Sequence, residues 1–158
     1  MAPAVPATHE RFGAMARLET SRLILRFVLA AAYFGAGIAH LRLPAAFLSI
    51  TPDWVPQPEL VIATTGVAEI LGATALVAVP SLRRAAAVCL ALYAVCVFPA
   101  NVKHAVDAVA AYGLSAWWPY HAPRLALQPI IVWWALFAGG LTAWPFGRNT
   151  SDGPATGR

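Results

Sequence analysis

Residues 59–79 read ELVIATTGVAEILGATALVAV, and this stretch decides what kind of protein the chain is. Almost every residue in it is apolar or small, and its length matches the roughly 20 residues with which a helix crosses a bilayer. One carboxylate, Glu69, lies at its middle. An ionisable group at that depth is costly, and function is the first hypothesis for it. We therefore ask whether the chain spans a membrane and what surrounds Glu69.

The composition of the whole chain predicts an integral membrane protein. Of the 158 residues, 59% are hydrophobic and 11% are charged, whereas soluble domains carry about 25% charged residues. The mean hydropathy is +0.65. A soluble fold would have to expose most of these apolar side chains, so the composition favours a lipid bilayer as the surroundings of the protein.

Hydropathy predicts four transmembrane helices in this chain. They cover about residues 23–41, 60–79, 85–102 and 125–144. The apolar runs are continuous and lack the alternation of barrel strands, and the first run is longer than a cleaved signal peptide requires. We therefore expect an all-α fold, a four-transmembrane-helix antiparallel bundle over residues 22–146. Residues 1–21 and 147–158 are expected to be disordered cytoplasmic segments.

The basic residues predict the orientation of the chain. Eight of the eleven lie before or just inside the first span, in the short second connection or in the tail: Arg11, Arg17, Arg22, Arg26, Arg83, Arg84, Arg148 and Arg158. Only Arg42, Lys103 and Arg124 lie on the other side. The positive-inside rule then places both termini in the cytoplasm. Since topology accounts for the net charge of +4, we expect no nucleic-acid partner.

The two connections on the outer side contain many aromatic residues. The first, residues 42–59, is rich in proline and carries Trp54, and the second, residues 103–123, carries Trp117 and Trp118. Tryptophan favours the membrane interface, so we expect both connections to lie along the surface. They either form a lid over a site between the helix ends or only anchor the protein.

Glu69 lies on a stripe of small residues. Thr65, Gly66, Gly72 and Ala73 share its helix face, and small residues mark surfaces where helices approach closely. Glu69 is therefore expected to face protein. Three states stay open: a neutral acid that only joins helices, a carboxylate ionised against Arg124 or an imidazole at the base of an outward-facing pocket, or part of a proton path or metal site.

Each of the other spans contributes polar residues to the same interior. The candidate ligand pocket consists of His40, Glu69, Asn101, His104, Arg124 and Gln128, with Trp54, Trp117 and Trp118 as its lid and Glu69 as the candidate catalytic residue. His40 and His104 lack a diagnostic metal-binding spacing, so we expect no metal and disfavour haem. Cys89 and Cys96 form no CxxC pair, and we expect them to be small core residues.

Several motifs resemble those of the DoxX-like family of small bacterial membrane proteins. They are GAGIAHL (35–41), the proline-flanked stretch 52–56, GVAEILG (66–72), the arginine pair 83–84, VFPANVKHA (97–105) and RLALQ (124–128). The resemblance covers about residues 22–144. It implies a four-helix membrane bundle in the bacterial cytoplasmic membrane, with polar residues grouped near one side.

The resemblance also implies a functional context. Some DoxX-like proteins are subunits of a thiosulfate:quinone oxidoreductase, and others are linked with oxidative-stress and thiol systems. The recurring polar positions of the family correspond here to His40, Glu69, Pro99, Ala100, Asn101 and Arg124. The chain lacks an evident redox cysteine pair, which argues against direct disulfide exchange.

We expect an accessory or ligand-binding protein whose pocket holds a quinone-like molecule for a membrane or periplasmic redox enzyme. One alternative is a catalytic subunit of a quinone oxidoreductase in which Glu69 transfers a proton. Another is a purely structural scaffold. A homo-oligomer is compatible with each of these.

Overall fold

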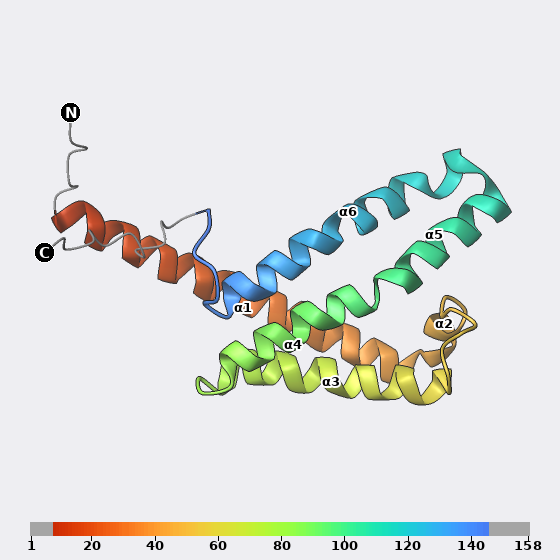
Figure 1. Cartoon of the computed structure of the whole chain (residues 1–158), viewed down its shortest axis with the longest axis horizontal. Coiled ribbons are helices and arrows are strands. Elements are labelled where there is room, and N and C mark those ends of the chain that lie inside the picture. Colours follow the sequence, from red (N-terminus) through yellow and green to blue (C-terminus); the bar gives the residue numbers. More distant parts are fainter. Residues whose placement is uncertain (1–7, 146–158) are drawn as a thin grey trace, which may run out of the picture.

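A computed structural model describes residues 8–145 of the chain, apart from the side chains of residues 8–11, 14 and 115–117, and contains helices and turns but no strand in this range (Figure 1). The helices are α1 (Thr8–Arg42), α2 (Pro44–Leu48), α3 (Pro58–Ala78), α4 (Arg83–Cys96), α5 (Phe98–Tyr112) and α6 (Leu114–Ala138). The expected all-α class is confirmed for the described residues. The expected disordered segments 1–7 and 147–158 lie outside them.

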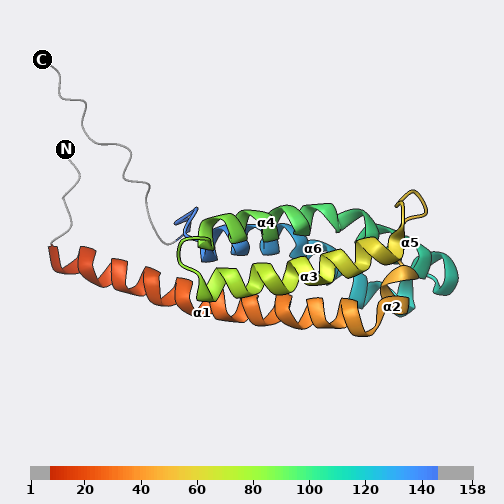
Figure 2. The ribbon, with the colours of Figure 1, turned by 90° about the horizontal axis from the view of Figure 1, so that it is seen from below.

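Helix α1 begins earlier than the sequence pattern suggested. Residues 8–21, expected to be disordered, continue the apolar part of α1 as one helix of 35 residues, and this part projects beyond the other helices (Figures 1 and 2). Extending an existing helix avoids the cost of nucleation, and no proline follows Pro6 until Pro44. A polar segment next to an apolar span therefore stays helical.

The third apolar segment is longer than expected and is divided in two. Helices α4 and α5 meet at Val97, because Pro99 has no N–H to donate to the carbonyl of Val95. Helix α5 then continues to Tyr112, and α6 begins after Gly113, whose φ of 76° suits glycine. The second outer connection is thus a helical hairpin and not a loop along the surface.

Three helical segments in the described part of the chain are long and apolar enough to cross a membrane. They are Met15–Arg42, Pro58–Ala78 and Arg83–Tyr112. The expected fourth span, 125–144, corresponds to α6, which is not among them. Helix α6 ends at Ala138, earlier than expected, and contains three prolines.

The helices form a closed set of contacts. Helix α1 packs most extensively on α3, α3 packs on α4, α4 on α6, and α6 returns to α1; Figure 2 shows α1 and α3 side by side. Two ends can be distinguished: the turn end, with residues 79–82 between α3 and α4, and the α2 end, where α5 and the start of α6 diverge from α1 and α3 (Figure 1).

The core consists mostly of alanine, leucine and one tyrosine. Its buried residues are Leu29, Ala30, Tyr33, Ala73, Leu76, Ala86, Ala87, Leu90, Ala91, Ala135 and Ala138. Cys89 and Cys96, expected in the core, are exposed. Small side chains let the helices approach closely, so this core is narrow and dense.

Candidate functional site

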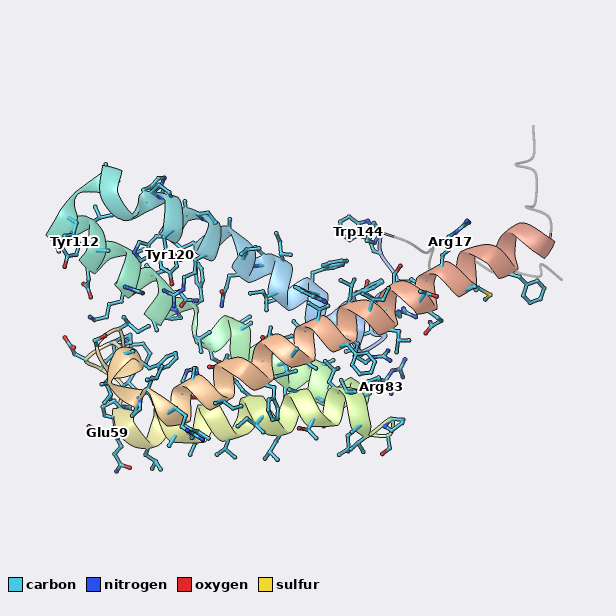
Figure 3. All side chains as sticks on the ribbon, turned by 180° about the vertical axis from the view of Figure 1, so that it is seen from behind. Arg17, Glu59, Arg83, Tyr112, Tyr120 and Trp144 are labelled. Atoms are coloured by element: carbon cyan, nitrogen blue, oxygen red, sulfur yellow. The ribbon has the colours of Figure 1, made fainter. Side chains whose placement is uncertain are left out.

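A cavity of about 800 Å³ lies between α1, α3, the α4–α5 junction and α6, towards the α2 end. Most of its lining is apolar. Its polar lining includes five of the six expected pocket residues and a tyrosine that we had not singled out: His40, Glu69, Asn101, Arg124, Gln128 and Tyr93. Figure 3 shows the two sides of this region, with Glu59 at the start of α3 and Tyr120 on α6.

Glu69 faces protein, as the stripe of small residues indicated. It is 3% exposed. A Cβ on Gly37 of α1 would lie 2.6 Å from the carbonyl oxygen of Gly66 on α3, so the two backbones nearly touch there. His40 lies one turn beyond Gly37, and this close contact brings its Nδ1 to 3.0 Å from Oε2 of Glu69.

The hydrogen bonds of His40 determine where its ring proton lies. Nδ1 is 2.9 Å from the carbonyl oxygen of Ala36; a carbonyl only accepts, so Nδ1 carries a hydrogen. That hydrogen points to Ala36, and no donor among the described residues satisfies the buried Oε2 of Glu69. Oε2 is therefore close to an imidazole and still lacks a directed hydrogen bond.

Aromatic side chains surround this pair. The ring of Phe47, on α2, stacks on His40 at 3.8 Å between ring centres. The Tyr93 hydroxyl is close enough to Glu69 and Thr65 to interact with both. We had not identified Tyr93, although its place four residues before Val97 on an apolar helix is an unusual position for a hydroxyl.

The second polar group of the cavity is a directed chain of hydrogen bonds between α5 and α6. Arg124 Nη2 donates to Oδ1 of Asn101 at 2.6 Å, and Asn101 Nδ2 donates to Oε1 of Gln128 at 3.2 Å. Gln128 Nε2 then donates to the carbonyl of Ala94. The break at Val97 interrupts the helical ladder beside Ala94, which is where Gln128 binds.

His104 belongs to this chain but does not line the cavity. Its Nδ1 is 2.6 Å from Nη1 of Arg124; arginine only donates, so Nδ1 accepts and the ring hydrogen lies on Nε2. Its ring meets that of His121 edge to face at 4.7 Å. His121 is 1% exposed, and neither of its nitrogens has a partner among the described residues. In the sequence, His121 lies three residues before Arg124, which is about one helical turn. This spacing could have identified His121 as a further polar residue of the same helix face.

The sequence left three states of Glu69 open. The structure places its carboxylate beside the imidazole of His40. No described contact joins Glu69 to Arg124, whose guanidinium is engaged by α5. The reason is geometric, since Arg124 lies on the α6 side of the cavity and Glu69 on the α3 side. The cavity thus has an acidic side and a basic side.

The expected lid is only partly next to the cavity. Trp54 lines its rim and is 73% exposed. Trp118 is 47% exposed and does not line it, and the side chain of Trp117 lies outside the described residues. Among the side chains that the structure describes, no group of three His, Cys, Asp or Glu residues is arranged to hold a metal ion.

Comparison with known proteins gives a family match. Residues 29–139 match the family described as a domain of unknown function, DUF8561, and this range contains every polar residue of the cavity. No curated protein and no solved structure matches the chain.

Proposed function

The chain belongs to the DUF8561 family, whose function is unknown, and we propose that it is a four-pass protein of the bacterial cytoplasmic membrane that binds a quinone-like molecule in its cavity. The bound molecule would serve a membrane or periplasmic redox enzyme. The single observation that carries this proposal is an apolar cavity of about 800 Å³ with an acidic group on one side and a basic group on the other.

The proposed topology takes α1, α3, the α4–α5 pair and α6 as the four passes of an antiparallel bundle. The contacts of these helices support it, because each pass packs on two others. Helix α6, with 25 residues, is about 37 Å long at 1.5 Å per residue, enough to cross the hydrocarbon core. Arg83 and Arg84 lie at the turn end, which the positive-inside rule assigns to the cytoplasm.

The chemistry of the cavity suits the head group of a quinone or quinol. Carbonyl oxygens accept hydrogen bonds, which guanidinium and amide groups at Arg124 and Asn101 can donate. The hydroxyls of a quinol donate, and Oε2 of Glu69 is a buried oxygen without a donor. A ligand pocket with apolar walls and few convergent polar groups fits such an amphipathic molecule.

The resemblance to DoxX-like proteins supports the redox context. The positions that carry it include His40, Glu69, Asn101 and Arg124, and these residues line the cavity. The proposal therefore rests on a pocket and on a resemblance that point to the same residues.

The test is binding of decylubiquinone and its quinol to the detergent-purified protein. We expect Glu69→Gln to weaken quinol binding by about tenfold, because the amide replaces an acceptor oxygen by a donor and leaves the quinol hydroxyl unpaired, which costs about 1–3 kcal/mol. Glu59→Gln, an exposed acid on the same helix, should change nothing. Absence of binding to the wild type, with no quinone retained in lipid extracts, would exclude this function.

A second candidate is a catalytic subunit, which the 3.0 Å approach of His40 to Glu69 favours. A bound quinol would pass two electrons to an oxidised centre of the partner enzyme, Glu69 would accept one proton, and water the other. This candidate requires that Glu69→Gln abolish turnover while the folded protein stays abundant and still binds quinone. If the protein is instead a purely structural scaffold, Glu69→Gln should cause only a small change in thermal stability.

A further inference from the structure

A group of arginines at the turn end carries more charge than the protein around it compensates. Arg22 and Arg26 lie on α1, and Arg83 begins α4. Arg26 interacts electrostatically with both of the others and with Glu19. Glu19 forms an ion pair of 2.7 Å with Arg22. Arg22 and Arg26 thus share one carboxylate, which is itself largely exposed, and no ion pair of Arg83 with a described carboxylate is found.

The end of α6 and the segment that follows it hold two of these arginines in place. Arg26 Nε donates to the carbonyl of Ala138 at 3.0 Å, and Arg22 Nη2 donates to the carbonyl of Thr142 at 3.0 Å. Ala138 is the last residue of α6, where carbonyls lack helical donors and the helix dipole favours cations, whereas Thr142 lies in the non-helical segment that follows α6. The side chains are therefore anchored before any ligand binds.

The third arginine is held in the same way from the other side. Arg83 Nε donates to the carbonyl of Leu76, near the end of α3, at 3.2 Å. A Cβ on Gly139 would lie 3.5 Å from the carbonyl oxygen of Arg83 and would collide with Ala87. The start of α4 therefore rests directly on the end of α6, and Arg26 and Arg83 reach the same small region.

Several donors of this group have no acceptor in the described part of the chain. Among the described side chains and backbone, no acceptor is found for the terminal nitrogens of Arg26 and Arg83. Arg26 is 9% exposed, and its terminal nitrogens are not among the fully buried atoms without a partner. Arg22 Nε is buried without a partner. Each backbone carbonyl satisfies one N–H and supplies only a partial charge. Apart from the exposed Glu19 carboxylate beside Arg22, the described residues supply these three arginines with no acceptor that carries a full negative charge.

We propose that Arg22, Arg26 and Arg83 bind the phosphate of an anionic phospholipid head group. Guanidinium groups bind phosphate oxygens through paired, charge-assisted hydrogen bonds. Leu23 and Phe27, next to these arginines on α1, are 49% and 53% exposed, and such apolar surface suits acyl chains beside the head group. Basic pockets between helices at the cytoplasmic surface bind lipid head groups in this manner.

The test is a thermal-unfolding titration of the full-length protein in mixed micelles that contain either phosphatidylglycerol or phosphatidylcholine. We expect phosphatidylglycerol to raise the melting temperature more than phosphatidylcholine does. Arg83→Gln and, separately, Arg22→Gln should each weaken the apparent affinity for phosphatidylglycerol about fivefold, which corresponds to about 1 kcal/mol. Because the two variants lie on different helices, a folding defect in one of them still leaves the other as a test of the lipid site.

Arg84→Gln is the matched control, because Arg84 is exposed and adjacent to Arg83. Retention of full lipid affinity in this variant supports a specific site formed by Arg22, Arg26 and Arg83. An equal loss in Arg84→Gln and Arg83→Gln would reduce the effect to diffuse surface charge and overturn the proposal. Equal shifts with the two lipids would overturn it as well. Inorganic phosphate is titrated separately. If phosphate alone raises the melting temperature as much as phosphatidylglycerol does, the site binds free phosphate and the lipid assignment is overturned.

Discussion

The turn end of the molecule is densely packed, whereas the α2 end is hollow. At the turn end, Gly139 lies directly against Ala87, and Leu76 and Phe137 are fully buried. At the α2 end, the helices separate around a cavity of about 800 Å³. Both ends are made of apolar helices, so hydrophobicity alone does not explain the difference.

Residue size and backbone breaks explain it. Small residues let α4 and α6 meet at the turn end, where Gly139 lies against Ala87, and let α1 and α3 meet at Gly37 and Gly66. Towards the α2 end, the break at Val97 and the prolines of α6 turn the chain away from α1 and α3, and polar side chains fill part of the space. The dense end is suited to positioning the helices, and the hollow end to holding a ligand.

The largest predicted effect comes from the close contact between Gly37 of α1 and Gly66 of α3, which lies beside His40 and Glu69. We expect Gly37→Ala to destabilise the protein by about 2 kcal/mol, because the new methyl group would meet a backbone oxygen at 2.6 Å. Gly35→Ala, on the same helix with nothing within 4 Å, should be neutral or stabilising by up to about 1 kcal/mol. Thermal unfolding in detergent measures both, and equal effects would contradict the close contact.

An intermediate effect is predicted for the basic side of the cavity. Arg124→Gln removes the donors to Asn101 and His104, so we expect quinone affinity to fall about tenfold, with a smaller loss of stability. Lys103→Gln is the control, since Lys103 pairs with Asp107 on its own helix and does not line the cavity. Isothermal titration with decylubiquinone measures the change, and unchanged affinity in Arg124→Gln would remove this side from the site.

The smallest effect is predicted at the rim. Trp54→Ala should leave stability within about 0.5 kcal/mol, because its side chain is 73% exposed. We expect ligand dissociation, measured by stopped-flow fluorescence, to become a few-fold faster. Trp118→Ala, which is away from the cavity, should leave the rate unchanged. A rate that responds to Trp118 and not to Trp54 would reverse the assignment of the lid.

Much of the helical structure follows from local sequence. The apolar runs predicted the segments 60–79 and 85–102 to within a few residues of where α3 and α4 begin, since apolar periodicity is a local property. The helical state of residues 8–21 was missed because composition does not reveal that a neighbouring helix can extend. The helical hairpin of α5 and α6 was missed because aromatic residues indicate an interface and not a backbone conformation.

The polar residues of the cavity could also be found from the sequence. Apolar helices make Glu69, Asn101, Arg124 and Gln128 conspicuous, and each of them lines the cavity. His121 escaped attention because it lies in a segment that reads as a loop. Its burial depends on how α5 and α6 pack, which no local pattern reports.

The sequence by itself determined that the chain is helical and apolar, and which polar side chains would be costly to expose to lipid. Only the tertiary structure decided that Glu69 lies beside His40, and that Arg124 instead binds Asn101 and His104. The physical reason is that pairing across helices depends on their rotation and spacing. These are set by the contact of Gly37 with the α3 backbone and by the break at Val97.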